Sequence, residues 1–138
     1  MMSVIVSDSG FAGDDWQGNL TPLADLAANG PVVGVDLPSH GDPAVLASRL
    51  GEVQMIRVDF PSFADGRGFT IAAMLRRMGF TGRLRACGHL IADQYAMARR
   101  SGFDEVEISD DLAVRQPQDQ WLARADHTAH DYGARLRG

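Results

Sequence analysis

The sequence contains no lysine and a single cysteine, Cys87. The missing lysine excludes a P-loop lysine, a Schiff-base lysine and a serine–lysine dyad. One cysteine excludes an internal disulfide framework and leaves too few thiolates for a cysteine-ligated zinc ion or iron–sulfur cluster. No apolar run reaches membrane-spanning length, and the run Ser3–Ser7 lacks the basic flank of a signal peptide. We therefore expect a cytoplasmic protein.

The balance of charge is acidic. All 13 positively charged residues are arginines, and 18 acidic residues bring the formal net charge to −5. Such a balance argues against general binding to nucleic acid or to an anionic membrane. We expect neither as a partner. A length of 138 residues with 45% hydrophobic residues is ordinary for one globular domain with one packed core.

Apolar runs of strand length alternate with helical patterns along the chain, which predicts a single α/β domain over residues 1–138, with about five βα units and a mostly parallel sheet. The expected strands are Ser3–Ser7, Pro31–Asp36, Gln54–Asp59, Arg83–Cys87 and Glu105–Ser109. We prefer an open sheet with helices on both faces to a partial barrel, because a closed barrel needs more strands. The glycine-rich stretch Ser9–Asn19 is interpreted as one surface loop. The tail from about Asp126 is expected to be loosely held.

Helix signals separate the strands. Two helices are expected to begin at Thr21-Pro22 and Asp42-Pro43, where a capping residue precedes a proline. A third helix is marked by one apolar stripe, which consists of Ile71, Met74, Leu75 and Met78. A fourth helix is expected from about Leu90 to the stop signal Gly102, and a short one around Gln118–Ala125.

One loop pattern suggests a ligand site. Asp65-Gly66-Arg67-Gly68 follows a strand and opens a helix, so backbone N–H groups and the helix dipole favour a small anion there. Such loops lie at the carboxyl edge of a parallel sheet, where ligands usually bind. The candidate ligand-binding residues at this edge are Asp65, Gly66, Arg67, Gly68, Arg85, Cys87, His89, Asp93 and Gln94. Asp36 and Asp59, also near strand ends, are interpreted first as caps of the following loops and second as candidates for lining the site.

Several of these residues also have a purely structural interpretation. Asp65 can cap the third helix while Arg67 pairs with Asp93. A cysteine at the position of Cys87, the end of a strand, is most often a small buried residue. The alternative is a reactive thiolate at Cys87, because His89 lies only two residues further along the chain.

Other patterns are less specific. Arg83 and Arg85 alternate along one strand and point to one face, which then meets either solvent or anions. A dinucleotide-binding loop is not favoured, because Ile71 occupies the third glycine position. His127 and His130 are too few to form a metal site. We expect no metal and no cofactor.

Sequence blocks in the second half of the chain resemble one family. The blocks are Phe60 to Arg76 with its Phe-x-Asp-Gly-Arg-Gly core, Gly82-Arg-Leu-Arg-Ala-Cys-Gly, Asp93-Gln94, and Arg100-Ser-Gly-Phe-Asp104. In this order they are similar to the bacterial domain-of-unknown-function family 934, with a family-like core from about Val58 to Ile108. His89 and Ala92 depart from that family, which usually has Asp and Arg at these positions.

The resemblance implies a pathway. Members of that family commonly accompany genes of assimilatory sulfate and sulfite reduction and are often labelled as oxidoreductases. Reducing sulfite to sulfide needs bound redox centres, and this sequence has no cluster, flavin or nicotinamide signature. We therefore do not expect a sulfite reductase by itself.

Two hypotheses remain open. In the first, the protein is an accessory factor that binds sulfite reductase or a neighbouring pathway enzyme through its third and fourth helices. In the second, the carboxyl edge binds a small oxyanion or phosphorylated metabolite, with Arg67 and Arg85 as anion clamps and Asp65 or Asp93 as acid or base.

Overall fold

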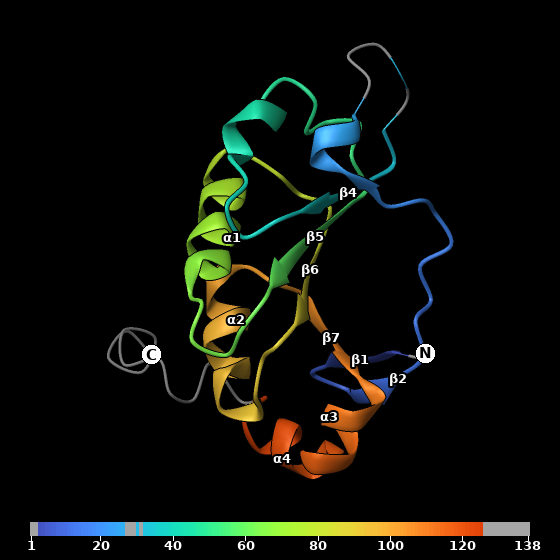
Figure 1. Ribbon diagram of the computed structural model, residues 1–138, viewed down its shortest axis with the longest axis vertical. Helices are drawn as coiled ribbons and strands as arrows, with labels where there is room; N and C mark the ends of the chain where they lie inside the picture. Colours follow the sequence, from blue (N-terminus) through green and yellow to red (C-terminus); the bar gives the residue numbers. More distant parts are fainter. Residues whose placement is uncertain (1–2, 27–29, 31, 126–138) are drawn as a thin grey trace, which may run out of the picture.

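The computed structural model describes residues 3–26, 30 and 32–125, which are built around one seven-stranded sheet. The strands are β1 (Ser3–Ser7), β2 (Gly10–Ala12), β3 (Thr21–Pro22), β4 (Gly34–Leu37), β5 (Met55–Phe60), β6 (Arg83–Gly88) and β7 (Glu105–Ser109). Their order across the sheet is β2-β1-β7-β6-β5-β4-β3 (Figure 1). β3 to β7 are parallel to one another, and β1 is antiparallel to both β2 and β7. The prediction of an open, mostly parallel sheet in an α/β domain is confirmed.

The five expected strands are present with small shifts at their ends. β1 and β7 match the predicted ranges, and β6 ends one residue later, at Gly88. β5 is shifted by one residue toward the carboxyl terminus, and β4 begins at Gly34. The pattern located these strands because alternate residues along them are apolar and buried in the core.

The amino-terminal part of the sheet departs from the βα pattern. β1 is followed by a tight turn at Asp8 and Ser9 and then by β2, which lies inside the stretch predicted to be a loop. Gly10 makes this return possible because its φ of +112° suits glycine alone. β1 then pairs antiparallel with β7, where Val6 faces Val106. Burial of these apolar pairs, which are distant in sequence, decides the direction of β1.

The first two predicted helices are much shorter than expected. Thr21-Pro22 forms the edge strand β3, and only η1 (Leu23–Asp25), a single 3₁₀ turn, follows it. At the second signal, the carboxylate of Asp42 accepts a 2.9 Å hydrogen bond from the N–H of Ala44 and caps the 3₁₀ helix η2 (Pro43–Leu46). The capping signal marks where a helix begins, and it does not set the length.

The later helices agree better with the pattern. In α1 (Arg67–Arg77), Ile71 and Leu75 of the predicted apolar stripe are buried, whereas Met74 and the capping residue Met78 are only partly buried. Gly79, whose φ is +101°, follows. The fourth helix begins as the 3₁₀ turn η3 (Ala92–Gln94), continues as α2 (Tyr95–Ser101) and ends at the left-handed Gly102. Two short helices close the described chain, α3 (Asp110–Arg115) and α4 (Gln118–Ala123). The predicted tail from Asp126 lies outside the described residues.

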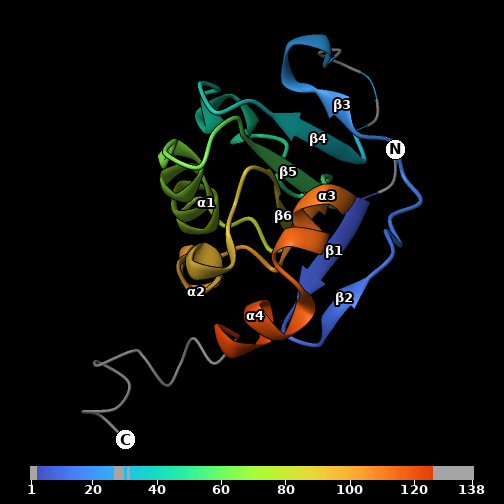
Figure 2. The same ribbon diagram turned by 60° about the horizontal axis from the view of Figure 1, so that its bottom comes forward.

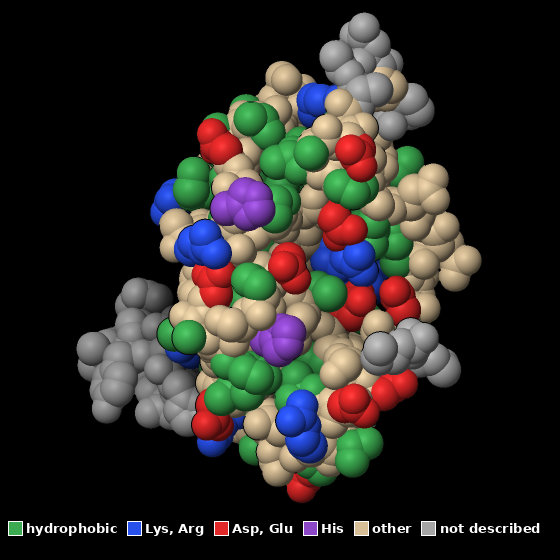
Figure 3. All heavy atoms as spheres, in the orientation of Figure 1, with side chains coloured by type: hydrophobic (Ala, Val, Ile, Leu, Met, Phe, Trp, Pro, Cys, Tyr) green, Lys and Arg blue, Asp and Glu red, His purple; other side chains and the backbone are tan. Residues whose placement is uncertain are grey.

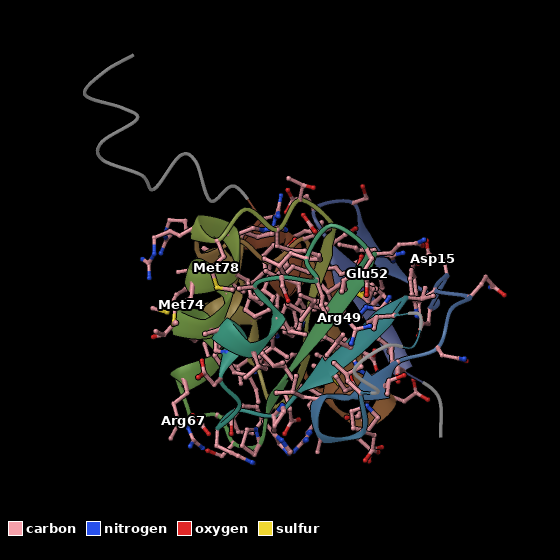
Figure 4. The ribbon with its side chains drawn as sticks, turned by 90° about the horizontal axis from the view of Figure 1, so that it is seen from above. Asp15, Arg49, Glu52, Arg67, Met74 and Met78 are labelled. Carbon is pink, nitrogen blue, oxygen red and sulfur yellow. The ribbon has the colours of Figure 1, made fainter. Side chains whose placement is uncertain are left out.

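The two faces of the sheet differ in chemistry. α1 and α2 lie side by side on the same face and cover an apolar core (Figure 2). Trp121 of α4 joins this core, with its ring 6.1 Å from the ring of Tyr95. The opposite face meets the segment that contains Asp15, which lies across the sheet from α1 (Figure 4). The expectation of helices on both faces is therefore wrong for the central strands, because that face is charged and pairs with acidic side chains.

None of the helices formed by the described residues has the length and apolar character that crossing a membrane requires.

Candidate functional site

The charged face of the sheet is organised around Arg85, whose side chain has no solvent exposure. Its guanidinium donates hydrogen bonds to Glu105 at 2.6 Å, Glu107 at 2.9 Å and Asp14 at 3.1 Å. Burial alone would lower the pKa of Arg85, but the hydrogen bond to Asp14 and the charge of Glu105 raise it above its usual value. Arg85 therefore stays charged, and carboxylates of this chain satisfy it.

The neighbouring arginines extend the same network. Arg83 donates a 2.9 Å hydrogen bond to Glu105 and also pairs with Asp15. Arg57 of β5 makes a two-point contact with Asp36, at 2.6 and 2.8 Å, and reaches Glu107 at 3.1 Å. Figure 3 shows basic side chains flanked by acidic ones over β5 and β6. Arg83 and Arg85 do point to one face, as predicted, and both pair there with carboxylates of this chain.

The Asp65–Gly68 loop is closed by its own ion pair. Arg67 donates to both carboxylate oxygens of Asp65, at 2.9 and 2.6 Å, and to the hydroxyl of Ser39 at 2.9 Å. The hydrogen bond from Arg67 holds the pKa of Asp65 well below its usual range. Asp65 also accepts the backbone N–H of Arg67 at 3.1 Å, which satisfies a free donor at the start of α1.

The suggested pair of Arg67 with Asp93 is wrong. Asp93 instead pairs with Arg124 at 2.8 Å, on the rim of a small hollow of about 240 Å³ beside α4. The sequence pattern placed Asp93 and Arg67 at the same edge. In the structure Arg67 pairs with Asp65, and Asp93 pairs with Arg124.

The two glycines of the loop have different roles. A Cβ at Gly68 would lie 2.3 Å from the ring of Phe60, and that ring is buried between Phe69 and Phe103. Gly68 thus lets the helix approach the sheet. A Cβ at Gly66 would meet only Phe69, at 3.9 Å, so the space there would accept a side chain.

His89 and Gln94 support the loops of the edge. The Nδ1 atom of His89 lies 3.2 Å from the carbonyl oxygen of Phe60, and its ring is edge-on to Phe63 at 5.3 Å. Gln94 donates to the carbonyl of Phe63 at 3.1 Å and accepts the N–H of Ile91 at 3.0 Å. Both side chains therefore hold the β5–α1 and β6–η3 loops together.

A pocket of about 320 Å³ lies at the carboxyl ends of β3 to β6. Its lining consists of Pro22, Leu23, Ala24, Asp36, Leu37, Pro38, Arg57, Asp59 and Cys87. Cys87 is the one member of the nine-residue candidate set in this lining, although Asp36 and Asp59 were suggested as lining groups. Arg57 was missed, and the signal that could have found it is its position two residues before Asp59 on the same strand face.

Cys87 is partly buried in this pocket, and its thiol is not activated. Burial and the charge of Glu107 raise the pKa of Cys87 to about 12, and the nearby Arg57 offsets only part of this effect. The thiolate is the nucleophilic form, so this raised pKa argues against Cys87 as a nucleophile at neutral pH. No hydrogen bond or ion pair joins Cys87 to His89 among the described residues.

A second surface lies on the helical side of the molecule. We call it the α1–α2 surface and define it by Arg77, Met97 and Arg100. Met97 is 48% exposed. Arg77 and Arg100 are exposed and make no ion pair or side-chain hydrogen bond with any described residue.

Within residues 3–26, 30 and 32–125, no group of three or more His, Cys, Asp or Glu side chains is placed to hold a metal ion. His127 and His130 lie outside the described residues.

Comparison with known proteins places the chain in one family. No curated protein and no solved structure matches the sequence. The profile of one family, described as bacterial protein of unknown function (DUF934), matches residues 34–137. This match extends well beyond the family-like core from Val58 to Ile108 and includes most of the sheet, the Asp65–Gly68 loop and both central helices. The chain therefore belongs to the bacterial DUF934 family.

Proposed function

We propose that this chain is a cytoplasmic accessory protein of assimilatory sulfite reduction, which acts by binding sulfite reductase. The pathway comes from the resemblance described above. The mode of action comes from one observation on the α1–α2 surface: two arginines that pair with no described residue lie beside the exposed Met97.

The α1–α2 surface has the composition of a protein-binding surface. Methionine is flexible and polarisable, and it is common where a surface adapts to a partner. Met97 lies in the same helix as Arg100, while Arg77 occupies the last turn of the adjacent, parallel α1. Most other arginines of the described chain are neutralised by carboxylates. Arg77 and Arg100 pair with none of the residues that the structure describes, so the surface favours an acidic patch on the partner.

The alternative, an oxyanion or phosphorylated-metabolite site at the carboxyl edge, has less support. Arg85 is fully buried against three carboxylates, and the charge of Arg67 is balanced by Asp65. An incoming anion would have to displace these carboxylates or approach them closely, and like charges repel. No observation at the edge favours a free anion over the acidic side chains already present.

The direct test uses sulfite reductase of the same bacterium, purified separately. Binding to this chain is measured by biolayer interferometry at low and high salt. We expect a complex that weakens with salt, because two arginines meet an acidic patch. The double variant Arg77→Glu/Arg100→Glu, and separately Met97→Glu, should weaken binding roughly tenfold or more.

Arg115→Glu is the matched control, because Arg115 is also exposed and unpaired among the described residues but lies on α3, away from this surface. The control should bind like the parent. The proposal fails if the parent chain shows no binding, or if the control weakens binding as much as the surface variants do. A measured rate of sulfide formation, with and without this chain, then reports whether the complex assists reduction.

A further inference from the structure

The pocket at the carboxyl ends of β3 to β6 has two dissimilar sides. One side is apolar and is formed by Pro22, Leu23, Ala24, Leu37 and Pro38. The other side is polar and is formed by Asp36, Arg57, Asp59 and Cys87. Ligand pockets commonly combine a mostly apolar wall with a few polar groups that orient the ligand. This pocket is separate from the α1–α2 surface and independent of the function proposed for it.

The polar side offers acceptors and few free donors. The Nε, Nη1 and Nη2 atoms of Arg57 each donate to a carboxylate, either Asp36 or Glu107. The thiol of Cys87 stays protonated at neutral pH, with the charge of Glu107 beside it. The single positive charge of the pocket is therefore shared between two acidic side chains.

Asp59 is the group without an internal partner. It lies near the end of β5, is exposed, and makes no ion pair or side-chain hydrogen bond with any described residue. Its neighbour in the adjacent strand is Cys87, which brings no positive charge. Asp36 and Asp59 together leave the lining of the pocket with one more negative charge than positive.

We propose that this pocket binds a small organic ammonium compound, with its charged group on Asp59 and Asp36 and its apolar body against Leu23, Leu37 and Pro38. A protonated amine supplies the donors that the polar side lacks and balances the excess negative charge. The volume of about 320 Å³ is at the small end of ordinary ligand pockets, which suits a metabolite of modest size.

The test compares three probes that share one apolar body: phenethylamine, 2-phenylethanol and phenylacetate. Each is titrated into the full, ¹⁵N-labelled chain at neutral pH, and amide shifts are followed by NMR. We expect phenethylamine to shift amides around Leu23, Leu37 and Asp59. The alcohol should bind roughly tenfold more weakly or worse, because it lacks the charge-assisted hydrogen bond, and phenylacetate should not bind.

Two variants test whether Asp59 binds the ammonium group of the probe. Asp59→Asn keeps the shape of the side chain and should weaken phenethylamine binding roughly tenfold, to the level of the alcohol. Asp119→Asn changes another exposed acid, on α4 and outside the lining of this pocket, and should leave the affinity unchanged. The melting temperature of each variant shows that the fold persists. Equal binding of all three probes, an unchanged affinity in Asp59→Asn, or amide shifts confined to another surface would each overturn the proposal.

Discussion

Arg85 and Glu105 face each other on neighbouring parallel strands, and a 2.6 Å hydrogen bond joins them although the arginine side chain has no solvent exposure. A charge so deeply placed is tolerated only when it is paired. The central strands of this sheet thus carry a charged network on one face and an apolar core on the other. A substitution in these strands therefore affects stability through ion pairs on one face or through apolar packing on the other.

Loss of Arg85 should be strongly destabilising. Arg85→Met leaves Glu105 and Glu107 buried with fewer partners, and we expect the free energy of unfolding to fall by about 3 kcal/mol. Urea denaturation followed by circular dichroism measures this. Adding Glu105→Gln should restore part of the loss, because one unpaired charge is removed.

Arg115→Met serves as the control for this substitution. Arg115 is exposed and unpaired among the described residues, so the change should stay within about 0.5 kcal/mol. If Arg85→Met were as mild as this control, the network would be of little consequence for stability.

The two glycines of the Asp65–Gly68 loop should respond in opposite ways to alanine. Gly68→Ala forces a methyl group into the ring of the buried Phe60 and should cost about 1–3 kcal/mol. Gly66→Ala would make only an ordinary 3.9 Å contact with Phe69, at a φ of −92°, and should be neutral or stabilising by about 0.5 kcal/mol. Thermal unfolding of both variants checks this. A tolerated Gly68→Ala would show that Phe60 can move, contrary to its packing between two other rings.

Cys87 should resist thiol reagents in the folded protein. With a pKa of about 12, almost none of the side chain is thiolate at neutral pH, so iodoacetamide should label it far more slowly than in denaturant. Mass spectrometry of timed samples gives both rates. Rapid labelling of the native protein would contradict the raised pKa.

The same pKa predicts how stability depends on alkaline pH. The pKa of Cys87 in the folded protein lies above its unfolded value of about 8.5, so the folded state is favoured below that pH. This contribution is lost as pH rises from about 8.5 toward 12, because the unfolded chain ionises first. Cys87→Ala should therefore show a shallower loss of stability over this range in urea denaturation at a series of pH values.

Sulfite, sulfate and phosphate should not stabilise the protein specifically. A ligand at a hundred times its dissociation constant would add about 2.7 kcal/mol to stability, which thermal unfolding detects easily. We expect no shift beyond that of chloride at equal ionic strength, because Arg67 and Arg85 are already paired. A shift seen in the parent and absent in Arg67→Ala would instead favour the oxyanion site.

The local features of the fold could be predicted well from the sequence. β1 and β7 match their predicted ranges, and α1 follows its apolar stripe to the glycine that stops it. These features depend on alternation and periodicity over a few neighbouring residues. The lengths of η1 and η2 could not be predicted in this way. Thr21, the first expected cap, lies in β3 and caps no helix, and the cap that Asp42 does form acts only on the first turn of η2.

The candidate site was harder to predict. The sequence placed Asp65, Cys87 and Asp93 at one edge. Asp65 lies in the β5–α1 loop, Cys87 near the end of β6 and Asp93 in η3. The pocket, however, joins that edge to Pro22 and Leu23, which lie far before Cys87 in the sequence. Only packing of η1 over the ends of β4 to β6 brings these walls together.

What the sequence determined by itself is the chemistry of each strand: which residues alternate, which face is apolar and which face carries arginines. The tertiary structure alone decided which carboxylate meets each arginine. Glu105 and Glu107 reach Arg85, and Asp36 reaches Arg57, only through the register of parallel strands and their order in the sheet. Register is set by burial of the whole apolar face, which is a property of the folded sheet and of no single strand.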